Sequence, residues 1–426
     1  MEMITTTTNA PSLPRTKTKE QLANILESKY EIWISPHFCF IITRWCNKKC
    51  NHCLWNCGPE KIEKLDKNQT KYIIEELASK WVKSISISGG EPFLHLDNLA
   101  FVTYHLWKNQ IKLKHIKTNM IHADHPYYKD KVQHIFIQYM IGLKEAGIKN
   151  PEYYLSQWIE PSIDEFHGNT VEELSKLKKI IDINMNIIKD SNFSNNRFMN
   201  VSIMRNLEKS KDLQNIFQII YFLQQKEYEV KFINKIYNRE SKKLEESQIT
   251  DNKEIINSLH KQIHNDYIKL EISKWWKTIC IRLGLNDIYK IWRATKLESN
   301  IQEKTLGKTD EYLKRYHQNF SISGIDNDGN LYTDEISTHT GNFPIGNIWD
   351  GMENTIEENS YNPILIELTN HGLSRVIEWL LEIYPDLAEF QYVVYDDILQ
   401  KIFSLPDGEE ILYELCFNEI IEDYDR

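Results

Sequence analysis

Four of the seven cysteines of this chain lie within twelve positions, in the segment CNKKCNHCLWNC at residues 46–57. Cys46, Cys50 and Cys53 have the spacing C-x3-C-x2-C, and Cys57 follows. A loop this short can bring three thiolates to three corners of a [4Fe–4S] cube, which leaves the fourth iron open for a further ligand. Two alternatives stay open at this point: a four-cysteine zinc site, and a closed ferredoxin-type cluster that only transfers electrons.

A second motif, Gly89-Gly90-Glu91-Pro92, comes directly after a predicted strand at residues 83–88, KSISIS. Paired glycines at a strand end let the backbone approach a ligand closely, and Glu91 adds a carboxylate at the same rim. Together these groups suit a bound ammonium group. By itself the motif would rather predict a tight turn into a helix. Its place one strand-and-helix unit after the cysteine loop favours the open cluster instead.

The elements that must position these motifs alternate between short strands and longer helices from about residue 36 to residue 237. Repeated strand–helix–strand units predict a parallel sheet, and six such units fit a partial or complete barrel. In a barrel of this kind the active site collects on the loops that follow the strands. The predicted strands cover residues 38–43, 83–88, 112–118, 156–163, 198–204 and 228–236.

The pair CNKKCNHC and SGGEP resembles the radical S-adenosylmethionine (SAM) superfamily, over about residues 38–236. The resemblance implies an α/β fold with a partial (β/α)6 TIM-like barrel. It also implies one [4Fe–4S] cluster bound by Cys46, Cys50 and Cys53, with Cys57 as a spare cysteine. One departure is His52, which stands where the family usually has an aromatic residue before the third cysteine.

The resemblance further implies where SAM binds. Its amino and carboxylate groups would take the open iron, and the rim Gly89-Gly90-Glu91-Pro92 would hold the methionine ammonium group. Later strand ends contribute polar residues that would contact the rest of the cofactor. These candidates are Asn119 after the third strand, Ser162 and Asp164 after the fourth, and Arg205 after the fifth.

The remaining sequence divides into four segments outside the predicted core of residues 37–237. We expect them to be an N-terminal extension (1–36), a helical segment (238–315), a hairpin extension (316–351) and an acidic helical region (352–426). The hairpin is centred on the turn sequence Asn-Asp-Gly-Asn. Its Asp326, Asp328 and Asn330 imitate a calcium loop, but Leu331 stands where such a loop needs glycine, so calcium is not expected.

The segments ISGIDNDGNLYTD and GNFPIGNIWDG resemble the SPASM or twitch extension of radical SAM enzymes that mature ribosomally made peptides. The resemblance implies reductive cleavage of SAM to a 5′-deoxyadenosyl radical, which abstracts hydrogen from a precursor peptide in an epimerisation, rearrangement or crosslinking. No cysteine lies between Cys280 and Cys416, so an auxiliary cluster is not expected. These two cysteines are candidate hydrogen donors, although such residues are more often small buried hydrophobes.

Two alternatives to a peptide substrate remain. The first is a radical SAM enzyme acting on a small molecule such as a nucleoside, sugar or amino acid. The more remote one is a non-catalytic iron–sulfur electron carrier or a zinc-binding protein, which would neither bind nor cleave SAM.

Composition and charge limit the partners. The net charge is −10, and residues 352–426 hold 18 acidic against three basic residues, so the rest of the chain is +5. This acidic region is either a solvated helical face or a docking surface for a basic partner. The sequence shows neither a secretion signal nor an apolar run of membrane length, so a cytoplasmic protein without membrane or nucleic-acid partners is expected. Reduction of a cluster would require an electron donor such as flavodoxin or ferredoxin.

Overall fold

The computed structural model separates into two compact units, and each is described by itself. The first unit comprises residues 1–41, 72–83 and 304–426, and the second comprises residues 42–71 and 84–303. Among the residues that the structure describes, no helix is long and apolar enough to cross a membrane. The described residues are 33–53, 55–124, 128–148, 159–163, 170–190, 198–204, 209–238, 243–249, 267–274, 277–286, 307–308, 321–333, 344–392 and 395–425.

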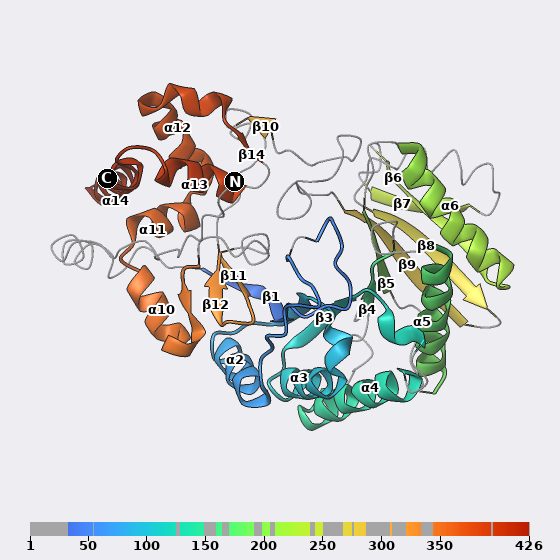
Figure 1. Ribbon diagram of the computed structural model, residues 1–426. Helices are drawn as coiled ribbons and strands as arrows, with labels where there is room; N and C mark the ends of the chain where they lie inside the picture. Colours follow the sequence, from blue (N-terminus) through green and yellow to red (C-terminus); the bar gives the residue numbers. More distant parts are fainter. Residues whose placement is uncertain are drawn as a thin grey trace. The chain divides into compact units, whose positions relative to one another are not determined.

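Parallel strands and helices begin the second unit, as predicted. The strands β2 (Ser84–Gly89), β3 (Lys112–Thr118) and β4 (Ile159–Pro161) pair in parallel in that order. The helices α3 (Leu96–Lys108) and α4 (Tyr128–Glu145) pack against each other on one side of these strands (Figure 1). This arrangement confirms the predicted α/β class.

Alternation along β2 explains this layering. Its sequence SISISG places isoleucines on one face and serines on the other, because successive side chains of a strand point to opposite faces. Ile85 and Ile87 are fully buried, as are Leu99 and Leu106 of α3. Short 3-10 helices, η1 (Pro92–His95) and η2 (Ile121–Asp124), follow the carboxyl ends of β2 and β3. The residues between strand and helix therefore lie at one edge of the sheet.

A five-stranded sheet completes the second unit, with the helices α5 (Thr170–Asp190) and α6 (Lys209–Gln225). Its strand order is β5-β9-β8-β6-β7. The β5–β9 pair is parallel and the other pairs are antiparallel. The strands are β5 (Phe198–Met204), β6 (Glu229–Asn238), β7 (Lys243–Ile249), β8 (Tyr267–Lys274) and β9 (Lys277–Asn286).

The helical prediction for residues 238–315 is wrong wherever the structure describes this segment. The described residues form β7, β8, β9 and a short strand, β10 (Gly307–Lys308). The strand sequences YIKLEISK and KTICIRLGLN alternate apolar and polar residues with the period of two that defines a half-buried strand. A scarcity of glycine and proline does not favour helix over strand. As a consequence β9 and β8 lie between β5 and β6. In a simple six-unit barrel β5 and β6 would be neighbours, so the sheet differs from that expectation here.

In the first unit, β1 (Ile34–Thr43) pairs in parallel with β11 (Ile322–Ile325). The strands β11 and β12 (Asn330–Tyr332) form the predicted hairpin, and β13 (Gly346–Asn347) extends it antiparallel to β12. The GNI segment predicted to frame the extension thus enters the sheet and then forms the 3-10 helix η5 (Ile348–Asp350).

The acidic region is helical, as predicted, with its expected break at Pro406-Asp407-Gly408. Many of its apolar side chains form a cluster to which Leu373, Leu380 and Cys416 contribute, and Ile366 and Ile420 form a second, smaller one. The helix α2 (Lys67–Ser79) begins in the second unit and ends in the first. The elements of the region are α10 (Met352–Asn359), α11 (Pro363–Asn370), α12 (Leu373–Ile383), η6 (Pro385–Glu389), β14 (Gln391–Tyr392), α13 (Tyr395–Phe403) and α14 (Gly408–Asp425).

Asp326 organises the hairpin turn from inside the protein. Its buried carboxylate accepts hydrogen bonds from the Asp328 amide (2.9 Å) and the Asn330 amide (3.0 Å). It also accepts from the Asn330 side chain (3.2 Å) and the Tyr332 hydroxyl (2.9 Å). The Asp326 carboxylate, which imitates a calcium ligand in the sequence, therefore accepts hydrogen bonds from donors of its own hairpin.

Replacing Asp326 should destabilise the first unit. In Asp326→Ala the buried donors lose their acceptor, and each such donor costs about 1–3 kcal/mol, so we expect a net loss of about 2–4 kcal/mol. Urea unfolding followed by tryptophan fluorescence measures this loss. The matched control is Asp328→Ala at the exposed neighbouring carboxylate, which should change stability by less than about 0.5 kcal/mol. Equal losses in the two variants would contradict the role given to Asp326.

Candidate functional site

The cysteine loop leaves the end of β1 and is closed at its base by backbone pairing. Isolated bridges join Trp45 to Gly58 and Thr43 to Lys64. The Cys46 amide donates to the Gly58 carbonyl (3.2 Å), and the Gly58 amide donates to the Arg44 carbonyl (3.3 Å). The cysteines thus lie on a loop whose two ends are fixed to each other.

Two of the three predicted cluster ligands already accept N–H donors at sulfur. Cys46 Sγ accepts from the Lys48 amide and from the side-chain amide of Asn119, both at 3.4 Å. Cys53 Sγ accepts from the Cys57 amide at 3.3 Å. Donors of this kind stabilise a thiolate and tune the reduction potential of an iron–sulfur cluster. The three cysteines form no disulfide and share one closed loop. Among the described residues no group of three Cys, His, Asp or Glu side chains is placed to hold a metal ion, so the cluster stays a prediction from the sequence.

Cys57 is in a different environment from its neighbours. Its thiol is buried and lies 3.6 Å from the Trp55 carbonyl, to which it donates a weak hydrogen bond. Burial raises the pKa of Cys57 well above the usual value of a thiol. Burial also raises the pKa of Cys46, to about 11, so iron would have to displace a proton to bind it. Cys46 also receives the Lys48 and Asn119 donors, which suit a thiolate.

The GGEP motif packs directly on the start of the cysteine loop. The Gly90 amide donates to the Thr43 carbonyl (2.7 Å), and the Glu91 amide donates to the Trp45 carbonyl (2.8 Å). A Cβ atom on Gly90 would lie 2.0 Å from the Trp45 carbonyl oxygen, so this position has room only for glycine. Gly89 has a φ of 119°, which glycine adopts without strain. The two sequence motifs therefore meet through their backbones.

The Glu91 carboxylate is fully buried among donors from two segments, η1 and the end of β3. It accepts from the Phe93 amide (3.0 Å), the Asn119 amide (2.6 Å) and the Thr118 hydroxyl (2.9 and 3.0 Å). The Phe93 bond caps η1, which begins at Pro92. Burial nevertheless raises the pKa of Glu91 to about 7, and the hydrogen bonds and the charge of Lys48 oppose this rise. A carboxyl at this pKa would be ionised by a nearby cation.

Asn119 bridges the two motifs. Its main-chain amide donates to Glu91, and its side-chain amide donates both to Cys46 Sγ and to the Asn47 side chain (2.9 Å). Its own side-chain oxygen accepts from the Ile121 amide (3.2 Å). The sequence predicts Asn119 as a cofactor-binding residue, and the structure places it between a cysteine ligand candidate and the carboxylate.

One ion pair of the site was not predicted from the sequence. The Lys48 ammonium, within the cysteine loop, lies 2.5 Å from the buried carboxylate of Glu173 in the first turn of α5. The two residues are 125 positions apart, and Glu173 resembles any helix-start acid, so no local signal identifies the pair. The contact ties the cysteine loop to α5.

The other predicted site residues lie in different parts of the chain, and two of them are not among the described residues. The Ser162 amide donates to the Thr118 carbonyl (2.9 Å), so Ser162 lies beside the end of β3. Asp164 and Arg205 lie outside the described residues. Of the two candidate hydrogen donors, Cys280 is paired with Phe198 in the β5–β9 ladder, and its side chain is outside the description. Cys416 is fully buried in the helical cluster of the first unit.

Glu91 should make the stability of the cofactor-free chain depend on pH. Its folded pKa of about 7 exceeds the ordinary 4.5, so the folded chain holds this proton more tightly than the unfolded chain. The stabilisation is complete below pH 4.5 and is lost as pH rises through 7. At about 1.4 kcal/mol per pKa unit the loss is on the order of 3 kcal/mol.

Glu91→Gln cannot titrate, so comparing it with the wild type isolates this effect. We expect wild-type stability relative to the variant to fall between about pH 5 and about pH 8, measured by urea unfolding at several pH values. A difference that is constant with pH would contradict the raised pKa of Glu91.

Comparison with known proteins gives one family and one short sequence match. Residues 40–154 match the model described as the Radical SAM superfamily. A segment of 54 residues is 39% identical to the GTP 3′,8-cyclase of Chlorobaculum tepidum, and it covers 13% of this chain and 16% of that protein. The match thus spans about a sixth of the relative's length.

Solved structures with a similar arrangement have low sequence identity. anSMEcpe with bound AdoMet is 12% identical, with a TM-score of 0.40 and coverage of 92% of this chain and 100% of that one. Streptococcus suis SuiB bound to S-adenosylmethionine is 10% identical, with a TM-score of 0.41, covering 85% and 77%. SuiB bound to precursor peptide SuiA is 11% identical, with a TM-score of 0.42, covering 85% and 76%.

Proposed function

We propose that this chain reductively cleaves SAM at a [4Fe–4S] cluster and uses the resulting 5′-deoxyadenosyl radical to abstract hydrogen from its substrate. The match of residues 40–154 to the Radical SAM superfamily model supports this proposal. One observation supports this most strongly. The cysteine loop and the GGEP motif are joined by the Gly90 and Glu91 amides and by Asn119. Cluster ligands and an ammonium-binding rim would then be adjacent, as SAM on an open iron requires.

Each residue of the site has a role that its environment supports. Cys46, Cys50 and Cys53 would bind the cluster, and the backbone and side-chain donors at Cys46 and Cys53 would stabilise their thiolates. Glu91 would pair with the ammonium group of SAM, and that cation would hold the carboxyl in its ionised form. Asn119 donates to both Glu91 and Cys46, so it would fix the distance between the Glu91 carboxylate and the Cys46 thiolate. Their burial excludes water from the space between them.

We further propose a ribosomally made precursor peptide as the substrate. The support is the hairpin β11–β12 with the β13 segment, whose sequence resembles the extension of peptide-modifying members. This extension holds no cysteine between Cys280 and Cys416, which disfavours reactions that need an auxiliary cluster. A redox-neutral change such as Cα epimerisation fits best. Incubation of the enzyme with peptides encoded beside its gene, in D2O, should incorporate deuterium at the modified residue.

SAM cleavage tests the central proposal. The chain, reconstituted with iron and sulfide without oxygen, should convert SAM to 5′-deoxyadenosine when dithionite is added, as measured by liquid chromatography and mass spectrometry. The control omits dithionite and should give none. A preparation that carries a complete cluster and binds SAM but yields no 5′-deoxyadenosine would refute the proposed reaction.

The ligand assignment predicts a contrast between two cysteines of one loop. Cys53→Ala removes a cluster ligand, so we expect SAM cleavage to fall by more than about a hundredfold, together with a loss of cluster iron. Cys57→Ala removes a buried thiol that donates a weak hydrogen bond to a carbonyl, and it keeps the backbone amide that donates to Cys53, so we expect it to keep both cluster and cleavage within about twofold. Iron analysis, electron paramagnetic resonance and 5′-deoxyadenosine yield measure the contrast. Equal loss in both variants would reopen the four-cysteine site.

A further inference from the structure

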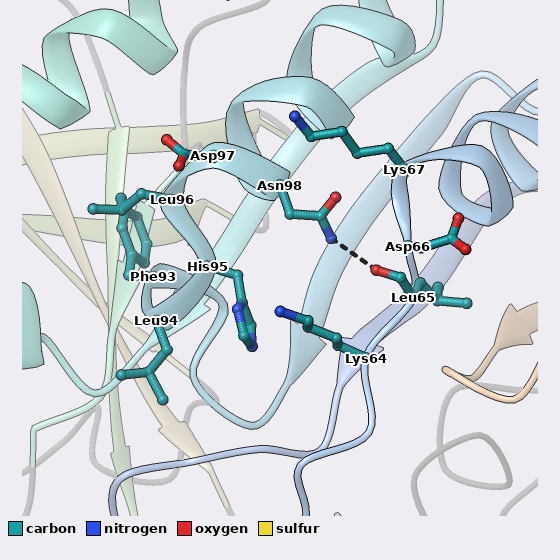
Figure 2. A pocket seen from close by; sticks show the side chains of 10 residues that line it. All are labelled: Lys64, Leu65, Asp66, Lys67, Phe93, Leu94, His95, Leu96, Asp97 and Asn98. Carbon is teal, nitrogen blue, oxygen red and sulfur yellow. Dashed lines mark hydrogen bonds between the residues drawn. The ribbon is translucent and has the colours of Figure 1, made fainter.

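A cavity lies on the outer side of the GGEP motif. It has a volume of about 650 Å³ and is lined by residues 64–67, which precede and begin α2, and by residues 93–98, which lead into α3 (Figure 2). None of these residues was assigned a function from the sequence. Both segments belong to the second unit, together with the cysteine loop.

The cavity presents two ammonium groups. Lys64 and Lys67 are exposed, and neither forms an ion pair with another residue that the structure describes. The two acidic residues of the lining, Asp66 and Asp97, lie at the beginnings of helices instead. Asp66 accepts from the Gln69 amide (2.8 Å) at the beginning of α2, and Asp97 lies in the first turn of α3. Figure 2 shows Lys64 and His95 turned toward each other, with both carboxylates on the outer sides.

Two polar atoms of the lining have no hydrogen-bond partner within the described part of the chain. They are Nε2 of His95 and Oδ1 of Asn98, and both atoms are buried. The Lys67 ammonium lies over the Phe101 ring, 5.6 Å from its centroid, and forms no ion pair with a described residue. Buried polar atoms are rarely left unsatisfied, so a site that keeps two of them beside exposed lysines is suited to a polar partner. Burial and the nearby Lys64 charge lower the pKa of His95, as expected for a ring in a cationic cavity.

The cavity is in direct ring contact with the cysteine loop. The rings of His95 and Trp45 have centroids 4.9 Å apart. Trp45 precedes the first cysteine ligand candidate, Cys46, and its carbonyl accepts the Glu91 amide (2.8 Å). A partner bound at the cavity would be separated from the cysteine loop by this one pair of tilted rings, whose planes meet at 47°. Electron transfer weakens steeply with distance, so this is a short entry route.

The surface beside the cavity has the character of an interface. Ile62 is 72% exposed and lies between Lys61 and Glu63 in the sequence, with Lys64 next. Residues 44–71 contain seven Lys and Arg against three Asp and Glu, a local charge of +4 in a chain of net charge −10. An exposed aliphatic residue within a basic segment is suited to a partner that is acidic around an apolar centre.

We propose that this surface, formed by Ile62, Lys64, Lys67 and the cavity at His95, docks the acidic carrier protein that reduces the cluster. The proposal rests on the proposed function and adds the place where its electron enters. The carrier, of the flavodoxin or ferredoxin type, loses one electron from its reduced flavin or iron–sulfur centre. The cluster gains that electron, and no bond of either protein forms or breaks.

The test compares two reductants on the same reconstituted enzyme. Dithionite is a small reductant that needs no docking surface, whereas flavodoxin, supplied with its reductase and NADPH, needs one. In K64E/K67E we expect flavodoxin-driven 5′-deoxyadenosine formation to fall about tenfold and dithionite-driven formation to stay within about twofold. The wild-type flavodoxin rate should also fall as salt rises, since screening weakens surface charge pairs.

A matched charge reversal elsewhere on the unit controls for net charge. K144E/K179E changes two exposed lysines of α4 and α5 by the same amount and should leave both rates unchanged. Equal flavodoxin-driven rates in K64E/K67E and the wild type would overturn the proposal. Equal loss with both reductants would overturn it too, because the lysines would then serve the SAM site.

Binding gives a readout that does not depend on turnover. Calorimetric titration of oxidised flavodoxin into the reconstituted enzyme should show about tenfold weaker binding for K64E/K67E than for the wild type. Unchanged affinity would overturn the docking surface even if SAM were not cleaved. Failure of the proposed function shows separately, as the absence of dithionite-driven cleavage in the wild type.

Discussion

The site depends on one buried carboxylate. Glu91 accepts donors from Phe93, Thr118 and Asn119, while its own amide donates to Trp45, so one residue joins the loops after three strands. Burying an ionised carboxylate without hydrogen-bond partners costs so much free energy that it would not stay in the interior in that form. Its donors stabilise the ionised form, but burial still holds its pKa near 7. The site is therefore assembled around a charge that a cationic ligand would complete.

Close backbone packing makes this assembly possible. The Gly90 amide reaches the Thr43 carbonyl because no side chain stands between the end of β2 and the start of the cysteine loop. The Lys48–Glu173 pair then holds the other part of the loop to α5. A buried pair of this kind contributes little net stability, and its better-attested use is to fix one arrangement over others. Here the arrangement that it fixes is the position of the cysteine loop.

Local sequence patterns predicted the strands β1 to β6, the hairpin and the acidic helices, because each has a clear period or turn signal of its own. They failed for β8 and β9, whose alternation was outweighed by the scarcity of glycine and proline. The motifs predicted the cysteines and Glu91, since those residue types at that spacing are specific. The bridge made by Asn119 and the ion pair of Lys48 could not be predicted, because both join segments more than 70 residues apart.

Hydrogen bonding also distinguishes Cys57 from two of the cysteines that the family resemblance makes cluster ligands. Cys46 and Cys53 receive N–H donors at sulfur, whereas the Cys57 thiol is itself a donor, to a carbonyl. N–H donors at sulfur favour the thiolate form, whereas a thiol that donates to a carbonyl has to keep its proton. Burial raises the pKa of both Cys46 and Cys57, so the two environments differ in their donors and not in the direction of the pKa shift. The Cys57 amide also donates to Cys53 Sγ, which gives position 57 a use that does not need its side chain. The Cys57 backbone therefore donates to a cysteine that is a predicted cluster ligand.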